Sequence, residues 1–205
     1  MTPELFDDIC RSSLGHRTSL EQTYDLARNT LARGVAGDFV ECGVFAGASS
    51  ALMAHAILDQ FGGFHPGMPI RVHLFDSFEG IPMPGPHDDP SQVKAGAAAC
   101  SLEDCKRNLI ERWHVPEGLL VWHKGWFKFT VPESVNPVNA TNIKEIALLR
   151  LDGDLYESTA LPMEYLFPLV AKGGYVICDD YDLIGCRYAL QEVVMPAPVA
   201  FRKWW

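Results

Sequence analysis

Two pairs of aspartates, each placed directly after an apolar segment, constrain the fold more than any other feature of this sequence. Asp152 and Asp154 follow the apolar segment 145–151, and Asp179 and Asp180 follow a second apolar segment. Short apolar runs of this kind are typical of buried parallel strands. If the two strands are neighbours, the four carboxylates lie at the carboxyl edge of one sheet, where open α/β folds bind ligands.

Carboxylates gathered at one edge raise each other's pKa unless a cation neutralises them. Oxygen ligands of this kind suit a hard divalent ion such as Mg²⁺. The alternative is that each aspartate only turns the chain or caps the next helix, because Asp is common after strands for those reasons. The pattern therefore indicates a magnesium site and leaves the purely structural role open.

Strands and helices alternate along the chain, which predicts an α/β fold: a doubly wound, mostly parallel sheet with helices on both faces. Thr18 or Ser19 is the expected cap of the first helix, and Ser101 that of the helix at 101–113. No linker divides the chain, so residues 1–205 are expected to form one domain with an N-terminal helical segment at 1–35. The expected helices are 18–34, 48–61, 101–113, 157–170 and 184–193, and the expected strands are 39–42, 70–75, 119–123, 145–151, 174–178 and 198–202.

The segment 80–100 is rich in Pro, Gly and Asp and too irregular to form a core element. We expect a mobile surface segment there. Long loops of this kind often cover active sites.

The composition excludes several classes of function. The net charge is −9 with no basic run, which argues against nucleic acid as a partner. No segment has the roughly 18 apolar residues that would span a membrane, and the acidic N-terminus lacks a secretory signal core. The six cysteines contain no Cys-x-x-Cys pair, so reduced thiols in a cytoplasmic protein are expected.

A small-residue turn follows the first strand and leads into a helix. It contains Glu41, Gly43 and Gly47. Glycines at such a turn let a ligand approach the backbone, and the helix N-terminus favours a negative group such as a carboxylate. The spacing differs from the dinucleotide fingerprint, and glycine-rich turns of this kind occur in many folds.

Two further strand ends carry groups suited to a nucleoside. Asp76, followed by Ser77, can accept both hydroxyls of a ribose, although an Asx turn explains the same pair. Gly125, Trp126 and Phe127 follow the third strand, and the two rings can stack on a flat heterocycle or simply pack beneath a loop. A carboxylate, a ribose and an adenine together fit S-adenosylmethionine better than NAD, because no pyrophosphate loop is present.

Five segments in order resemble the macrocin O-methyltransferase (TylF-like) family of class I S-adenosylmethionine-dependent methyltransferases, which includes sugar methyltransferases of the mycinamicin and novobiocin pathways. The resemblance implies a Mg²⁺-dependent O-methyltransferase acting on a sugar or another hydroxyl of a natural product, antibiotics included. It covers nearly the whole chain from about residue 18. The segments are GDFVECGV (37–44), FDSFEGIP (75–82), KGWF (124–127), LRLDGDLYEST (149–159) and GGYVICDDY (173–181).

The resemblance also implies roles for single residues. Asp152, Asp179 and Asp180 would hold the metal. Asp154 would be the general base that removes the hydroxyl proton. The residues expected at the cofactor site are Glu41, Gly43, Gly47, Asp76, Ser77, Gly125, Trp126 and Phe127.

The chain departs from the family pattern in two places. Phe129 stands where the family usually has an acidic residue, and fewer residues than usual follow Cys186, which predicts a shortened C-terminal end of the sheet. The aromatic side chains of Phe201, Trp204 and Trp205 fit a homodimer interface or the edge of the sheet.

The expected partner is a small hydroxylated acceptor. A catechol-like acceptor is a second candidate, since vicinal hydroxyls suit bidentate binding to a metal. A different class is a cofactor-binding protein with lost or altered catalysis. Retention of all four aspartates argues against that class, because a bare carboxylate cluster destabilises a fold.

Overall fold

The computed structural model describes residues 1–194, with side chains described as far as Glu192. Within these residues, five strands form one sheet in the order β3-β2-β1-β4-β5, and all neighbouring pairs are parallel. This confirms the predicted doubly wound sheet. The strands are β1 (Asp38–Cys42), β2 (Val72–Asp76), β3 (Leu120–Lys124), β4 (Ile146–Leu151) and β5 (Val170–Cys178).

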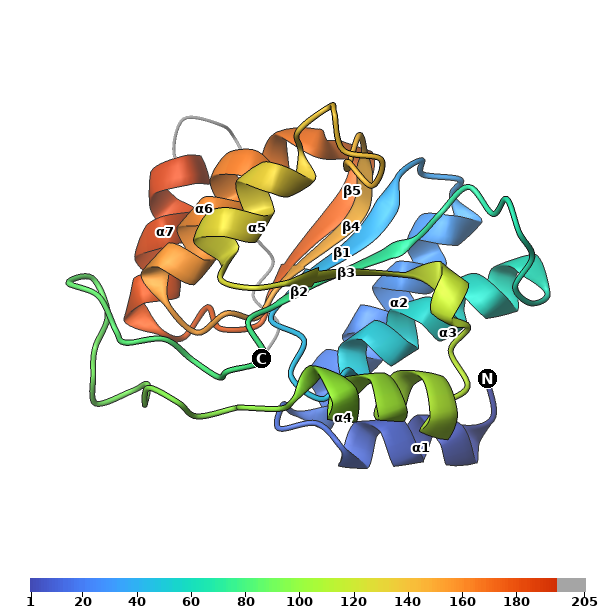
Figure 1. Ribbon diagram of the computed structural model, residues 1–205, viewed down its shortest axis with the longest axis horizontal. Coiled ribbons are helices and arrows are strands. Elements are labelled where there is room, and N and C mark those ends of the chain that lie inside the picture. Colours follow the sequence, from blue (N-terminus) through green and yellow to red (C-terminus); the bar gives the residue numbers. More distant parts are fainter. Residues whose placement is uncertain (195–205) are drawn as a thin grey trace.

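Helices cover both faces of the sheet, with α2 and α3 on one side and α5, α6 and α7 on the other (Figure 1). The α-helices are α1 (Pro3–Arg11), α2 (Arg17–Ala32), α3 (Ala48–Phe61), α4 (Leu102–Lys106), α5 (Phe127–Ser134), α6 (Tyr156–Tyr165) and α7 (Ile184–Val194). A π-helical turn, η1 (Arg107–Arg112), continues α4, and two 3₁₀ turns are η2 (Glu117–Leu119) and η3 (Phe167–Leu169).

Alternation along the strands divides the core into two layers. Phe39 and Leu74 point into the layer beneath α2 and α3, whereas the next residues, Val40 and Phe75, point into the layer beneath α5 and α6. Both layers are apolar, so each strand reads as a nearly continuous hydrophobic run, as expected of a parallel sheet.

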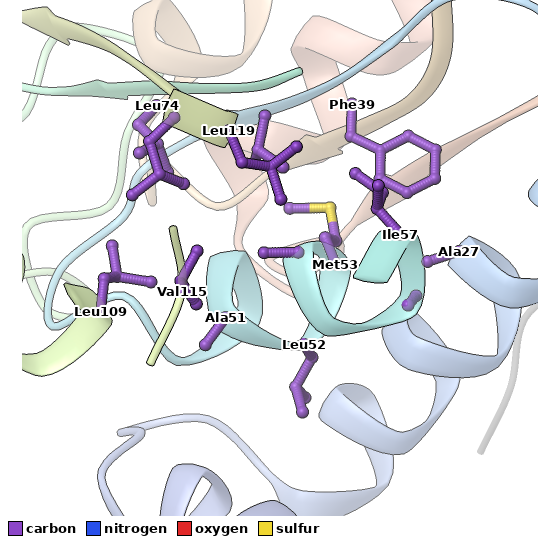
Figure 2. Packing of buried hydrophobic residues seen from close by; sticks show 14 of the residues in the cluster. Ala27, Phe39, Ala51, Leu52, Met53, Ile57, Leu74, Leu109, Val115 and Leu119 are labelled. Atoms are coloured by element: carbon purple, nitrogen blue, oxygen red, sulfur yellow. The ribbon is translucent and has the colours of Figure 1, made fainter. Parts of the chain in front are cut away.

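Helix α3 is the most buried helix among the described residues, since every residue from Ala48 to Ile57 is buried. Its many alanines and serines let the sheet approach it closely. Figure 2 shows Met53 and Ile57 of this helix directed toward Leu119 and Phe39 on the sheet side. The helix predicted at 48–61 is therefore confirmed at the same bounds, and its N-terminus is fixed beside the end of β1.

The bounds differ from the prediction at two helices. Helix α2 begins at Arg17 with His16 as its cap, not Thr18 or Ser19. Helix α6 stops at Tyr165, and residue 170 already belongs to β5, so the predicted helix at 157–170 is too long. The 3₁₀ turn η3, between α6 and β5, contains a proline, which has no N–H group to continue the helical hydrogen bonds.

Two helices have no bounds in the prediction: α1, which lies in the predicted helical segment at 1–35, and α5. In α1, the hydroxyl of Thr2 caps the first turn by accepting the N–H of Leu5. In α5, Trp126 precedes the first turn without a side-chain cap, and a proline lies inside the helix, so local signals are weak. Short helices of this kind owe their stability to packing against the sheet, which a local pattern does not reveal.

The strand predicted at 198–202 and the aromatic residues Phe201, Trp204 and Trp205 lie outside the described residues. No helix within residues 1–194 is long and apolar enough to cross a membrane.

Candidate functional site

The register of the sheet brings four strand ends to one level. Cys42 pairs with Phe75 on one side and with Leu151 on the other, and Leu151 pairs with Cys178. The next residue of each strand therefore lies at the same carboxyl edge. These next residues are Asp76, Gly43, Asp152 and Asp179.

A cavity of about 420 Å³ opens at this edge. Its walls come from the strand ends, from the turn between α1 and α2, from the segment 77–100, and from the start of α5 and α6. The predicted site residues that line it are Gly43, Asp76, Ser77, Trp126, Phe127, Asp152, Asp154, Asp179 and Asp180. The structure thus brings these predicted residues together around one cavity.

Three predicted cofactor residues, Glu41, Gly47 and Gly125, do not line this cavity. Glu41 is 0% exposed, and its carboxylate accepts the hydroxyls of Ser49 and Ser50 in the first turn of α3. Burial raises the pKa of Glu41 to about 7. Glu41 thus lies behind the wall of the cavity, where it fixes the start of α3.

Gly43 lies where the turn after β1 comes close to the turn after β4. Its φ is +96°, and a Cβ at this position would lie 1.7 Å from the carbonyl oxygen of Asp152. Only glycine satisfies both conditions. The glycine therefore allows the turn after β1 to lie against the carboxylate-bearing turn after β4.

Asp76 organises the backbone of two turns. Its Oδ2 accepts the N–H groups of Val44 at 2.8 Å and Phe45 at 2.9 Å, and its Oδ1 accepts the N–H of Phe78 at 2.7 Å. The bond to Phe78 is the Asx turn that the sequence left open as an alternative. Asp76 nevertheless lines the cavity, so the turn and a ligand contact are compatible.

Three carboxylates converge on the cavity. One oxygen each of Asp152, Asp179 and Asp180 lies within 4.8 Å of the other two. Burial, followed by the neighbouring charges of Asp152 and Asp154, raises the pKa of Asp180 to about 8. Burial also raises the pKa of Asp152, against the lowering effect of Arg150. Like charges held this close favour a bound cation.

Arg150 is a buried cation next to this cluster. It lies on β4 and is 2% exposed. Its Nη1 lies 3.1 Å from Glu41 and 2.5 Å from Asp152, and its Nη2 lies 3.1 Å from Asp179. One guanidinium thus joins the carboxylate behind the cavity to two of those that line it.

Asp154 lies beside the three carboxylates in a strained backbone conformation. Its φ is +63°, and its backbone N–H donates to Oδ2 of Asp180 at 2.9 Å. Burial, followed by the charges of Asp152 and Asp179, raises the pKa of its carboxyl group to about 6. A residue held in a sparsely populated conformation at a ligand site is a frequent sign of function.

The segment 80–100 forms no helix or strand, as predicted, and neither do residues 77–79 before it, but the whole segment 77–100 is tied to the cavity. The carboxylate of Asp88 accepts the N–H of Tyr156, the first residue of α6, at 2.7 Å, and that of Gly85 at 2.8 Å. A Cβ on Gly185 of α7 would lie 2.0 Å from Asp88, so only glycine leaves room for this contact. His87 stacks on the ring of Tyr156 at 4.4 Å. The segment therefore forms one wall of the cavity.

Other walls come from the aromatic pair and from the N-terminal segment. Trp126 and Phe127 line the cavity at the start of α5, whereas Phe129 is 64% exposed and does not line it. Between α1 and α2, Leu14 and Gly15 also line the cavity. The turn between the two N-terminal helices therefore forms part of the cavity wall.

The raised carboxyl pKa values predict an unusual pH dependence of stability in the metal-free protein. The folded state keeps protons on Glu41 and Asp180 that the unfolded state has lost, so the free energy of unfolding falls as pH rises. His55 and His123 have lowered pKa values and act in the opposite direction, but only below about pH 6.5, where unfolded histidine ionises. We expect the melting temperature in EDTA to fall by about 3 °C or more between about pH 6.5 and 8.

Differential scanning calorimetry across this pH range checks the expectation. Asp180→Asn removes one titrating group and should make the fall smaller. A melting temperature that rises with pH in the metal-free wild type would contradict the assignment.

Sequence reasoning missed three contributors to the site: Arg150, Ser19 and Asp88. Arg150 carries a signal in hindsight, because a charged residue inside a buried strand requires partners. The hydroxyl of Ser19 donates to Asp179 across 160 residues of sequence, and the bond from Tyr156 to Asp88 spans 68. Contacts at such separations leave no local pattern.

Comparison with known proteins points to one family. The model of the macrocin O-methyltransferase family (TylF) matches residues 9–196 of this chain. The chain is 39% identical over 168 residues to 8-demethyl-8-(2,3-dimethoxy-alpha-L-rhamnosyl)-tetracenomycin-C 4'-O-methyltransferase of Streptomyces olivaceus, an alignment that covers 79% of this chain and 59% of that protein. It is 33% identical over 185 residues to demethyldecarbamoylnovobiocin O-methyltransferase of Streptomyces niveus, with 84% and 64% covered.

A solved structure agrees with this similarity. The O-methyltransferase NovP superposes with a TM-score of 0.73 at 33% identity, covering 86% of this chain and 71% of that one. The five-stranded parallel sheet is thus that of a class I methyltransferase fold. The chain spans less than two thirds of the length of the tetracenomycin and novobiocin relatives.

Proposed function

Because the chain belongs to the macrocin O-methyltransferase (TylF) family, we propose that it transfers a methyl group from S-adenosylmethionine to a hydroxyl of a small molecule with the help of Mg²⁺. The observation that carries the proposal is the convergence of Asp152, Asp179 and Asp180 within 4.8 Å of one another. Asp154 lines the same cavity. A cation held by these three carboxylates would lie beside a candidate base, which supports the proposal.

The cavity fits the methyl donor. S-adenosylmethionine carries a carboxylate, a ribose and an adenine, and its sulfonium supplies an electrophilic methyl group. The start of α3 beyond Gly43 offers a helix N-terminus for the carboxylate. Asp76 and Ser77 offer acceptors for the ribose, and the rings of Trp126 and Phe127 offer an apolar surface for the base.

The carboxylate cluster fits Mg²⁺. It supplies three oxygen donors, and oxygen donors are the ligands that Mg²⁺ prefers. Among the described residues, no histidine or cysteine lines the cavity, so the ligand set favours Mg²⁺ over a softer metal. A bound Mg²⁺ would lower the pKa of an acceptor hydroxyl and orient it.

The side chains divide the remaining work. Asp154 has a pKa of about 6, so it is mostly ionised at neutral pH. This pKa is also close to the operating pH, as suits a group that takes up a proton during the reaction. It accepts the proton of the acceptor hydroxyl as the oxygen attacks the methyl group. Trp126, Phe127 and the wall formed by the segment 77–100 exclude water and align the two reactants.

For the acceptor we propose a sugar hydroxyl or another hydroxyl of a natural product. The tetracenomycin relative is named for O-methylation of a rhamnosyl derivative of tetracenomycin C, and the novobiocin relative for O-methylation of demethyldecarbamoylnovobiocin. A catechol-like acceptor is the second candidate, since the cluster can take two neighbouring oxygens. We further propose a single cytoplasmic domain, with Glu41, Gly47 and Gly125 supporting the cofactor site from behind the cavity wall.

Isothermal titration calorimetry tests the proposal directly. S-adenosylmethionine and S-adenosylhomocysteine are titrated into metal-free protein, and Mg²⁺ is titrated separately. We expect micromolar binding of both cofactors, about −8 kcal/mol, and a Mg²⁺ signal that the double variant Asp179→Asn, Asp180→Asn lacks. An exposed pair, Asp104→Asn and Asp182→Asn, serves as the matched control.

Each result has a definite meaning. Cofactor binding without a Mg²⁺ signal would contradict the metal-dependent reaction and favour a metal-free transferase or a protein without catalysis. Absence of cofactor binding would contradict the methyltransferase activity as a whole.

A further inference from the structure

Each carboxylate of the proposed cation site is held by one of its two oxygens. Oδ2 of Asp152 accepts from Arg150 at 2.5 Å, and Oδ2 of Asp180 accepts a backbone N–H at 2.9 Å. Oδ1 of Asp179 accepts the hydroxyl of Ser19 and lies 3.1 Å from Nη2 of Arg150. For all three, the described part of the chain supplies no hydrogen bond to the second oxygen.

Holding one oxygen fixes the plane of a carboxylate. The terminal torsion of an aspartate is broad and roughly two-fold, so an untethered carboxylate samples many orientations. In this site protein donors occupy one oxygen of each group, and an oxygen from each group lies within 4.8 Å of the others. The cluster is therefore arranged before a cation arrives, which lowers the entropy lost on binding.

Among the donors to these three carboxylates, Ser19 is the most distant in sequence from the carboxylate it binds. It lies in the first turn of α2, on the opposite face of the sheet from α6, and does not line the cavity. Its hydroxyl reaches the aspartate that follows β5, across 160 residues of sequence. The turn just before it, which includes Gly15, does line the cavity. Any effect of Ser19 on a cation must therefore act through Asp179.

We propose that Ser19 is a positioning residue for the cation site: its hydroxyl, together with Arg150, orients Asp179 so that the free oxygen of that carboxylate is presented to Mg²⁺. This inference rests on the proposed function, because the cation belongs to it. The N-terminal helical segment then controls metal binding as well as forming a wall of the cavity.

The competing explanation is that the bond from Ser19 to Asp179 only fastens α2 to the sheet. The two explanations differ in what they predict for the cation. A fastening role changes the stability of the fold and leaves Mg²⁺ affinity alone. A positioning role changes Mg²⁺ affinity at constant cofactor affinity.

The test uses three variants on the same helix. Ser19→Ala removes the hydroxyl, Ser19→Thr keeps it, and Thr30→Val removes a different buried hydroxyl, one that donates only to the carbonyl of Leu26 at 2.7 Å. Mg²⁺ and S-adenosylhomocysteine are titrated into each by calorimetry, and melting temperatures are recorded in EDTA.

We expect Ser19→Ala to raise the dissociation constant of Mg²⁺ by about tenfold or more, the usual effect of losing a partner of a metal ligand. S-adenosylhomocysteine affinity should stay within about twofold, and Ser19→Thr and Thr30→Val should bind Mg²⁺ like the wild type. Equal Mg²⁺ affinity in Ser19→Ala and wild type would overturn the positioning role alone. A wild type that binds no Mg²⁺ would overturn the metal part of the proposed function as well.

Discussion

Replacing Asp154 with asparagine is expected to lower the turnover number by about a hundredfold to ten-thousandfold, the usual contribution of a positioned general base. Binding of S-adenosylmethionine should be unchanged, because Asp154 is proposed to act on the acceptor proton. Asn has the shape of Asp without its ability to take a proton. Single-turnover kinetics with saturating cofactor, combined with calorimetry, separate the two quantities.

The local geometry lets asparagine replace Asp154 without disturbing the backbone of the turn. Asp154 has a φ of +63°, a region that Asn tolerates nearly as well as Asp. Its backbone N–H, which donates to Asp180, is unaffected by the change. Loss of turnover would therefore reflect the lost carboxylate and not a rearranged turn.

Asp182→Asn is the control for Asp154→Asn, because Asp182 is exposed and does not line the cavity. It should retain wild-type turnover. If Asp154→Asn retained more than about a tenth of wild-type turnover, the carboxylate would not be the general base.

The sequence was most informative where its signals were local. Apolar runs marked the strands, and a parallel register then placed every residue that follows a strand at one edge. The sequence predicts Asp76, Asp152 and Asp179 at this edge for that reason, and the register Phe75–Cys42–Leu151–Cys178 explains why the three aspartates lie together. No other property of these aspartates was needed.

The sequence was least informative where partners are distant. Glu41 is expected at the cofactor site because the resemblance to the macrocin O-methyltransferase family implies it. Its neighbours Ser49 and Ser50, eight and nine residues on, instead hold it behind the wall, and Arg150 lies 109 residues away. Whether the side chain of Glu41 faces the cavity or the buried guanidinium of Arg150 depends on which strands pair, and no local sequence motif predicts that pairing.

Contacts between residues far apart in the sequence also limit how well secondary structure can be predicted. Helices α1 and α5 are short and are held mainly by contacts with the rest of the fold. The end of α6 was placed too late, because the apolar residues of η3 continue the helical pattern while its proline interrupts the ladder.

Arg150→Met is expected to destabilise the fold by about 3–5 kcal/mol, because it leaves buried carboxylates without their cation. Arg150 is 2% exposed and Glu41 is 0% exposed, so water does not compensate for the lost charge. Urea denaturation in EDTA measures the change. Arg112→Met is the matched control, because Arg112 also binds an aspartate through two nitrogens but is 46% exposed. Its replacement should lower the free energy of unfolding by no more than about 1 kcal/mol.

The double variant Arg150→Met, Glu41→Gln locates the source of the effect. If the penalty arises mainly from the buried carboxyl group of Glu41 left without its partner, the second change should restore much of the stability lost by the first, a coupling of about 1–3 kcal/mol. No recovery would place the penalty on Asp152 and Asp179, which face the cavity. Mg²⁺ should then restore stability to Arg150→Met, since a cation bound by those carboxylates would replace the missing charge. The guanidinium and the metal would in that case be alternative sources of positive charge for the same carboxylates.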